Sequence, residues 1–435
     1  MAMRIVDSKF IREGMTLISG NVWAQLIAFA AYLVLTRLFT PEDMGVYNVF
    51  YSYIDVLIIL STGRYELAVV MARDDREAQT VSRLSLRINL FFCLLLLAIV
   101  MCVLWCPGVS TLSKGKMGYV ALLIPPMVYF CGTSRVYAAL FNRLREFRHI
   151  ALSEVAGSTA GVVAKVVMGL PHLASTVWHT VGLPLGAVLG KAASNINYRL
   201  KMKQMGVRLY DLRRRDAAEQ RVAAASYRNF PLFTMPKDFI NSFSYNLPFL
   251  WLALYFDKAA VGLFGLALTF TFRPVNILNS AFERLLYVRV VDKVRARQSI
   301  SGDLKRFVLY LNAVAIPVFV LLFFFADTLF ELFFGGRWAG CGYYVRCLLP
   351  WVFIMLTSTS LMFLSNVFSR QRTEFGFYVV LMLLRIASVV VGILSGNFRL
   401  AILLFALAGA VVSAALLVWY AVMVYRYEKN REAIQ

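Results

Sequence analysis

The sequence predicts an all-α polytopic membrane protein, with about twelve transmembrane helices in two six-helix lobes and both termini in the cytoplasm. The 435-residue chain is 60% hydrophobic and only 16% charged, with a mean hydropathy of +0.67. Soluble domains average about 45–50% apolar and about 25% charged residues. Nearly uncharged runs of roughly 20 residues recur, which is the length that crosses ~30 Å of hydrocarbon as a helix. Spans in the second half of the chain also begin at a nearly constant offset from the corresponding spans in the first half.

The spans can be placed in order along the chain. The first follows a basic segment but lacks an A-x-A cleavage signal, so we expect it to be retained. The seventh is interrupted by Pro231, Pro236 and Pro248, and the eighth contains Arg273 next to Pro274, where we expect kinks or breaks. The twelve expected spans are 14–36, 44–72, 83–106, 117–140, 150–171, 174–198, 229–255, 259–287, 306–333, 342–367, 374–395 and 399–425.

The distribution of basic residues predicts the orientation. With the N-terminus inside, the inside segments carry 30 Lys and Arg and the outside segments six, as the positive-inside rule requires. The net charge of +21 is therefore mainly a topology signal and an attraction for anionic membrane lipids, and we expect no nucleic-acid partner.

Weak similarity between the halves predicts a parallel internal repeat. At an offset of 217 residues, Gly45 falls on Gly262 and Glu66 on Glu283, whereas Arg64 falls on Ala281. Each half has six spans, so both enter the membrane from the same side. We therefore predict an N-terminal lobe at 1–198, a basic cytoplasmic linker with a surface helix at 199–228, and a C-terminal lobe at 229–435.

Catalytic and cofactor motifs are missing from the sequence. There is no G-x-x-x-x-G-K-[ST], no G-x-S-x-G and no long external loop that could hold a catalytic domain. The six cysteines form no C-x-x-C, and His149, His172 and His179 have no metal-ligand spacing. We expect no enzyme activity, no cofactor and no metal site.

Charges within spans are costly, so by default they face a cavity or a partner. Lys191, Arg284 and Arg346 lie near span ends and can snorkel to the interface. The remaining bases are candidate contacts for an anionic substrate: Arg64, Arg135, Lys165, Lys237, Arg273 and Arg385. The candidates for coupling to a proton or cation are Asp55, Glu66, Asp238 and Glu283, and Glu154 is a further intramembrane acid.

The second span carries a polar stripe. At 100° per residue, Asp55 and Glu66 lie about 20° apart, and Asn48 and Thr62 fall on the same face. The stripe is either a helix-packing surface or the wall of a cavity. Arg64 falls opposite, and i,i+2 positions do not face each other, so we predict that Arg64 and Glu66 do not pair. Gly63 is a point at which the helix can bend and bring Arg64 to the cavity.

Four stretches resemble the Wzx-type oligosaccharide flippases, relatives of the MATE exporters and of the lipid II flippase MurJ in the MOP superfamily. They are "RLFTPEDMGVYNVF…GRYELAVVMARDDREA", "YRNFPLF", "LFFGGRWAGCGYYVRCLLPW" and "NVFSRQRTEF". The resemblance implies a V of two lobes around a central cavity and alternating access in the bacterial inner membrane. It also implies an undecaprenyl-diphosphate-linked oligosaccharide substrate, for O-antigen or capsule.

Within that resemblance, the residues suggest roles. Arginine holds a pyrophosphate well in a partly desolvated cavity, so Arg64 is expected to contact substrate, and Glu66 to be architectural or coupling. Candidate partners besides the substrate are H⁺ or Na⁺ and a polymerase of the same pathway. Alternatives are a MATE-type drug or cation antiporter, a polysaccharide polymerase or ligase, and a scaffold membrane protein.

Overall fold

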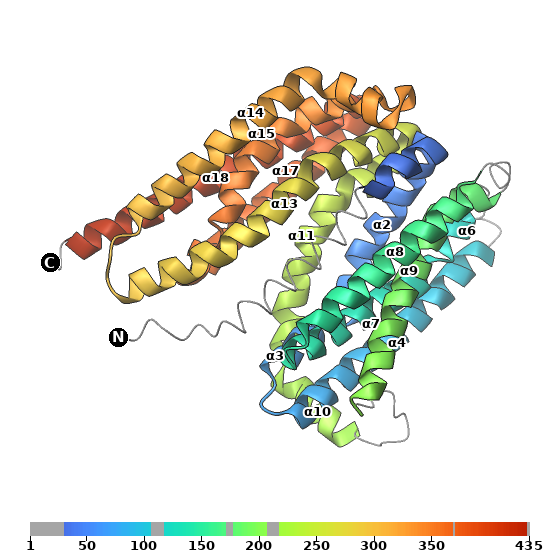
Figure 1. Cartoon of the computed structure of the whole chain (residues 1–435), viewed down its shortest axis with the longest axis horizontal. Helices are drawn as coiled ribbons and strands as arrows, with labels where there is room; N and C mark the ends of the chain where they lie inside the picture. The colour runs from blue at the N-terminus through green and yellow to red at the C-terminus, as the bar shows by residue number, and fades with distance from the viewer. Residues whose placement is uncertain (1–29, 106–116, 171–176, 207–216, 369, 433–435) are drawn as a thin grey trace. The chain divides into compact units, whose positions relative to one another are not determined.

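The computed structural model describes residues 30–105, 117–170, 177–206, 217–368 and 370–432. Every regular element in these ranges is a helix (Figure 1). Seven of the described helices are long and apolar enough to cross a membrane. Each predicted span after the first coincides with a helix or a broken helix, so the predicted all-α polytopic fold is confirmed, whereas the cytoplasmic position of the termini stays a prediction. Residues 14–29 of the first predicted span lie outside the described part, and 30–38 are helical.

The chain divides into two compact units, Met1–Asn246 and Leu247–Gln435. The lobe boundaries drawn from the repeat, with 199–228 as a linker, stay a prediction. The helices of the first unit are α2 (Pro41–Ser61), α3 (Tyr65–Met71), α4 (Asp75–Trp105), α6 (Met117–Ala121), α7 (Ile124–Arg143), α8 (Phe147–Met168), α9 (Val177–Gln204), α10 (Ala217–Ser226), η2 (Phe230–Thr234) and α11 (Met235–Leu247).

Helices α8 and α9 lie side by side with their backbones in close contact (Figure 1). A Cβ added to Gly190 would lie 2.7 Å from the carbonyl oxygen of Gly157 and 2.8 Å from the Cα of Gly161. Small residues at four-residue spacing allow this approach, which favours van der Waals packing between helices in a membrane. The glycines therefore fix α8 and α9 as a tight pair.

The segment predicted as a linker contains a helix that docks on the first unit. In α10, Glu219 pairs with Arg76 of α4 at 2.6 Å, and Gln220 accepts from Arg87 at 2.7 Å. Ala223 of the same helix is buried in a hydrophobic cluster with Tyr65 and α4. The basic stretch 207–216, expected to make the linker's surface helix basic, lies outside the described residues.

Prolines shape the seventh predicted span. Pro231 and Pro248 each stand in the first turn of a five-residue π-helix, η2 and η3 (Pro248–Leu252), on either side of α11. A π-turn accommodates the local change in hydrogen bonding, because proline lacks the backbone N–H that an α-helix needs. The predicted interruption at Pro231 and Pro248 is therefore present, whereas Pro236 lies within α11, in its first turn.

The second unit is a bundle in which α15 packs against α13, α14 and α18. Of the kink or break expected at Pro274, a break is absent, because α13 continues through this proline to Arg295. Arg346 of α15, expected to snorkel, pairs with Asp327 of α14 at 2.6 Å. The remaining elements of this unit are α12 (Ala253–Tyr255), α13 (Lys258–Arg295), α14 (Ser301–Phe334), η4 (Gly336–Trp338), α15 (Cys341–Ser360), α16 (Phe363–Val367), α17 (Gln371–Leu394) and α18 (Phe398–Glu432).

Candidate functional site

The second predicted span is broken between α2 and α3. Gly63 and Arg64 both adopt left-handed backbone conformations, with φ of 58° and 61°. This conformation costs an ordinary residue roughly 1–2 kcal/mol, so Arg64 occupies it only because its surroundings hold it there. Tyr65 N–H still donates to the Thr62 carbonyl oxygen at 3.2 Å, which closes the turn. The break therefore sets Arg64 apart from both helices.

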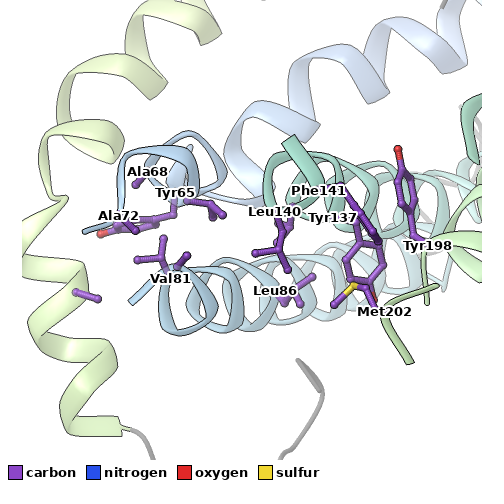
Figure 2. Close-up of a cluster of buried hydrophobic side chains, with 14 of the residues drawn as sticks. Tyr65, Ala68, Ala72, Val81, Leu86, Tyr137, Leu140, Phe141, Tyr198 and Met202 are labelled. Carbon is purple, nitrogen blue, oxygen red and sulfur yellow. The ribbon is translucent and has the colours of Figure 1, made fainter. Parts of the chain in front are cut away.

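A buried apolar cluster holds α3 in place on the far side of the break. Tyr65, Ala68 and Val69 are buried together with residues of α4, α7, α9 and α10. Figure 2 shows Tyr65 and Ala68 at one end of this cluster, and Tyr137 and Tyr198 at the other. The strained turn at Arg64 is thus supported by apolar packing over several helices.

Arg64 holds two carboxylates at once. Its Nη1 lies 3.2 Å from Oε1 of Glu66, and its Nη2 lies 2.8 Å from Oδ2 of Asp238 in α11. The prediction that Arg64 and Glu66 do not pair is wrong. That prediction assumed a straight helix, whereas Arg64 lies outside it, so the i,i+2 argument does not apply.

The polar stripe of the second span divides at the break. Thr62 is fully buried and Glu66 is 3% exposed, whereas Asp55 is exposed and Asn48 is half-buried. Glu66 Oε2 and Thr62 Oγ1 are buried without a hydrogen-bond partner in the described structure. Asp55 contributes its backbone carbonyl, which accepts from Ser242 Oγ of α11 at 2.9 Å. The hydrogen bond from Ser242 to Asp55 thus attaches α11 to α2. The ion pair of Asp238 with Arg64 attaches α11 to the break.

A second arginine approaches this group from α7. Arg135 lies within electrostatic range of Arg64, Glu66 and Asp55. Its Nη1 is buried and has no hydrogen-bond partner among the described residues. We call Arg64, Glu66, Asp238 and Arg135 the Arg64 cluster. It holds two guanidinium groups and two carboxylates within the first unit.

An ion pair extends the charged region toward α9. Lys191 of α9 lies 2.9 Å from Glu154 of α8, with both side chains about one-third exposed. Lys191 also interacts electrostatically with Arg135. The sequence interpretation treated Lys191 as a snorkelling residue, and Glu154 was not among the candidate site residues. Their partnership depends on the pairing of α8 with α9, for which the four-residue spacing of the glycines in both helices is the signal in the sequence.

The other predicted site residues are dispersed. Lys237, next to Asp238, is exposed. Lys165 Nζ bonds to the hydroxyl of Tyr47 at 2.6 Å, near the opposite end of α2 from Arg64. Their roles in substrate binding stay predictions.

Two further predicted residues belong to the second unit. Arg385 is 3% exposed, with its guanidinium carbon 4.8 Å from the ring centre of Trp351 and 4.7 Å from that of Phe405. Arg273 is half-buried in α13. Glu283 lies in the same helix, but its side chain is outside the described part. The structure therefore brings Arg64, Arg135, Glu66 and Asp238 together within the first unit, whereas Arg273 and Arg385 belong to the second unit.

The Arg64 cluster is suited to exchanging anionic partners. A guanidinium offers five N–H donors and binds carboxylate and phosphate with similar geometry. Both carboxylates of the cluster come from this chain, so an incoming phosphate would compete with groups already held. No group of three or more metal-ligating side chains occurs among the described residues.

The comparisons with known proteins agree with this architecture. A family model described as "Polysaccharide biosynthesis protein" matches residues 34–342. A search of curated proteins finds no match. The structure is similar to the lipid II flippase MurJ in an inward closed conformation, with a TM-score of 0.73 and 11% identity, over 96% of this chain and 91% of that one.

Two transporters give further likenesses. An inward-facing MATE family multidrug resistance transporter of the MOP superfamily matches with a TM-score of 0.68 and 12% identity, over 93% of this chain and 96% of that one. A MOP superfamily transporter from Pyrococcus furiosus, described as having a binding pocket of reversed polarity, matches with a TM-score of 0.55 and 12% identity, over 96% of each chain. At these identities the likeness establishes the fold alone, and together with the family model it confirms the resemblance stated from the sequence.

Proposed function

Because the chain belongs to the polysaccharide biosynthesis protein family, we propose that it is a flippase for lipid-linked oligosaccharide. In this proposal it moves an undecaprenyl-diphosphate-linked repeat unit from the cytoplasmic to the outer leaflet of a bacterial inner membrane, by alternating access. The product would serve the assembly of O-antigen, capsule or another surface polysaccharide. The family match and the transporter fold support this role, and the chain would act without catalysing a covalent reaction.

The observation that carries the proposal is the Arg64 cluster. An oligosaccharide varies between pathways, but the diphosphate that joins it to the lipid is always a concentrated negative charge. Two arginines in a partly buried site match that charge better than they match a cationic drug. The unpartnered Nη1 of Arg135 supplies a donor that needs no displacement of another group.

Release of the substrate follows from the same geometry. The diphosphate would replace Asp238 or Glu66 at the Arg64 guanidinium, and either carboxylate would return when substrate leaves. Glu66 belongs to α3 and Asp238 to α11, so this exchange would change the contacts of both helices. Glu66, with one oxygen unpartnered and buried, is the strongest of the proposed coupling candidates in the described part.

A deletion strain with complementation tests the proposal. Loss of the gene should cause lipid-linked oligosaccharide to accumulate at the cytoplasmic face and surface polysaccharide to fall, and the wild-type gene should restore both. Accumulation on the outer face would instead indicate a polymerase or ligase. Normal polysaccharide with increased sensitivity to cationic drugs would favour a MATE-type antiporter, and either result would overturn the flippase assignment.

A further inference from the structure

A buried carboxylate and an imidazole meet at the end of α2 remote from Arg64. Asp43 lies in the first turn of α2 and His179 in the first turn of α9. Their side chains are 5% and 11% exposed, and His179 Nδ1 lies 3.4 Å from Asp43 Oδ2. The 21 residues of α2 separate this pair from the break by about 30 Å at 1.5 Å per residue. In the sequence, His179 stands in no metal-ligand spacing.

Both nitrogens of the His179 ring face groups that accept protons. Nε2 lies 3.2 Å from the carbonyl oxygen of Leu38, at the end of the helix that covers 30–38. A carbonyl cannot donate, so Nε2 must carry a hydrogen for this bond to form. Nδ1 then faces the Asp43 carboxylate, and a bare nitrogen lone pair would be repelled by it. A proton on Nδ1 would let the ring donate to Asp43 as well.

The surroundings of Asp43 supply its carboxylate with several hydrogen-bond donors. Asp43 Oδ2 accepts from the backbone N–H of Thr40 at 3.1 Å and from its hydroxyl at 2.7 Å. Asp43 Oδ1 accepts from the Thr180 hydroxyl at 3.0 Å. Three donors and the N-terminus of α2 all stabilise the ionised carboxylate. An ionised Asp43 can also accept a hydrogen bond from a protonated Nδ1 of His179.

Other charges near the pair are few. On the 30–38 helix, Arg37 is exposed, and on α2, Glu42 is exposed. Tyr119 of α6 is exposed as well, and Lys165 of α8 bonds to Tyr47 one turn further along α2. Within the described part, Asp43 is thus the carboxylate that His179 contacts.

Apolar contacts hold the ring in its position. Phe39, which is fully buried, packs on the His179 ring with the centroids 4.7 Å apart. Such packing limits the ring's ability to turn away from Asp43 when its charge changes. A change in the protonation of His179 would therefore alter the contacts between the helices, because the ring is not free to rotate away.

We infer that Asp43 and His179 form a proton-binding site that ties together the 30–38 helix, α2 and α9. The bound proton gives His179 donors toward both Leu38 and Asp43. Its release leaves one of these two contacts without a donor, which weakens the junction of the three elements. The site is distinct from the Arg64 cluster, and its existence does not depend on the substrate.

Nitrogen NMR of the purified protein, with ¹⁵N-labelled histidine, tests this inference in lipid nanodiscs. The chain has three histidines, so the spectrum of a His179→Gln variant assigns the His179 signals by their disappearance. At pH 7.5, both His179 nitrogens should show the shifts of protonated sites. One protonated and one bare nitrogen in the wild-type ring would overturn the inference.

Two variants sharpen the test. Asp43→Asn removes the carboxylate charge at similar size, and His179 should then lose the proton on one ring nitrogen at the same pH. A His149→Gln variant is the matched control, because His149 lies at the start of α8 beside Glu146, and its loss should leave the His179 shifts unchanged. An unchanged doubly protonated ring in Asp43→Asn would show that Asp43 does not hold the proton. Because no transport is measured, these results stand apart from the proposed function.

Discussion

The guanidinium of Arg64 lies 2.8 Å from the carboxylate of Asp238, although Arg64 stands between α2 and α3 and Asp238 belongs to α11. The two side chains are only 16% and 25% exposed. Removing one member of such a partly buried pair leaves the other charge uncompensated, which costs more than an exposed surface pair. The predictions about this pair must therefore separate loss of stability from loss of substrate binding.

Arg64→Ala and Arg135→Ala should each reduce export of surface polysaccharide at least tenfold, because each removes a donor for the diphosphate. Export is measured as surface polysaccharide per molecule of transporter in the membrane. Arg337→Ala is the control, since this arginine is exposed in η4, and it should export normally. Normal export in both cluster variants would exclude them as substrate contacts.

Exchanging the charges of Arg64 and Asp238 separates structure from binding. Arg64→Asp alone places three carboxylates together and should lower thermal stability, whereas adding Asp238→Arg should recover part of the loss. The expected coupling is about 0.5–3 kcal/mol, measured by a double-mutant cycle of unfolding in detergent. Export should stay lost in the double variant, because the arginine has left the break. Recovered export would mean that only the ion pair matters.

Gly63→Ala should destabilise the protein by roughly 1–2 kcal/mol, since φ at this position is +58° and the new methyl group would press on the Tyr65 ring at 3.3 Å. Gly376→Ala is the matched control. Gly376 lies in α17 with open space around it, so alanine there should stabilise by about 0.5–1 kcal/mol. Both changes can be followed as shifts of the unfolding midpoint. Equal effects of the two substitutions would contradict a strained turn at Gly63.

Arg385→Ala should lower the stability of the folded protein more than it lowers export per folded molecule. Its guanidinium is buried between Trp351 and Phe405, where a desolvated cation–π contact is worth about 2 kcal/mol or more. We expect a lower unfolding midpoint and less protein in the membrane, with more than half of the export per folded molecule retained. Normal stability with export abolished would instead support the substrate contact predicted from the sequence.

Hydropathy and charge patterning predicted the helices well, because membrane spans are determined by composition over some 20 residues. Even the bend at Gly63 was visible as a possibility in the sequence. The pairing of Arg64 with Glu66 was not, since it depends on two consecutive left-handed residues rather than on helical periodicity. The continuous helix at Pro274 shows the opposite case, in which a residue that often breaks helices leaves α13 intact.

Long-range partners were the main gap. The sequence identified Arg64 and Asp238 as intramembrane charges but gave no reason to join them, because the contact depends on where α11 packs. His179 likewise has no motif, and its partner Asp43 resembles an ordinary helix-capping residue. Polar residues near span ends that also occupy the first turn of a helix are therefore worth testing in pairs.

The close approach of α8 and α9 has a practical consequence for genetics. Gly157 and Gly190 have no room for a side chain, so nearly any replacement there will reduce the amount of folded protein. A mutational screen scored only by surface polysaccharide would rank these positions beside Arg64. Screens of this protein should therefore be normalised to protein abundance, so that intolerant glycines are not mistaken for residues of the proposed substrate site.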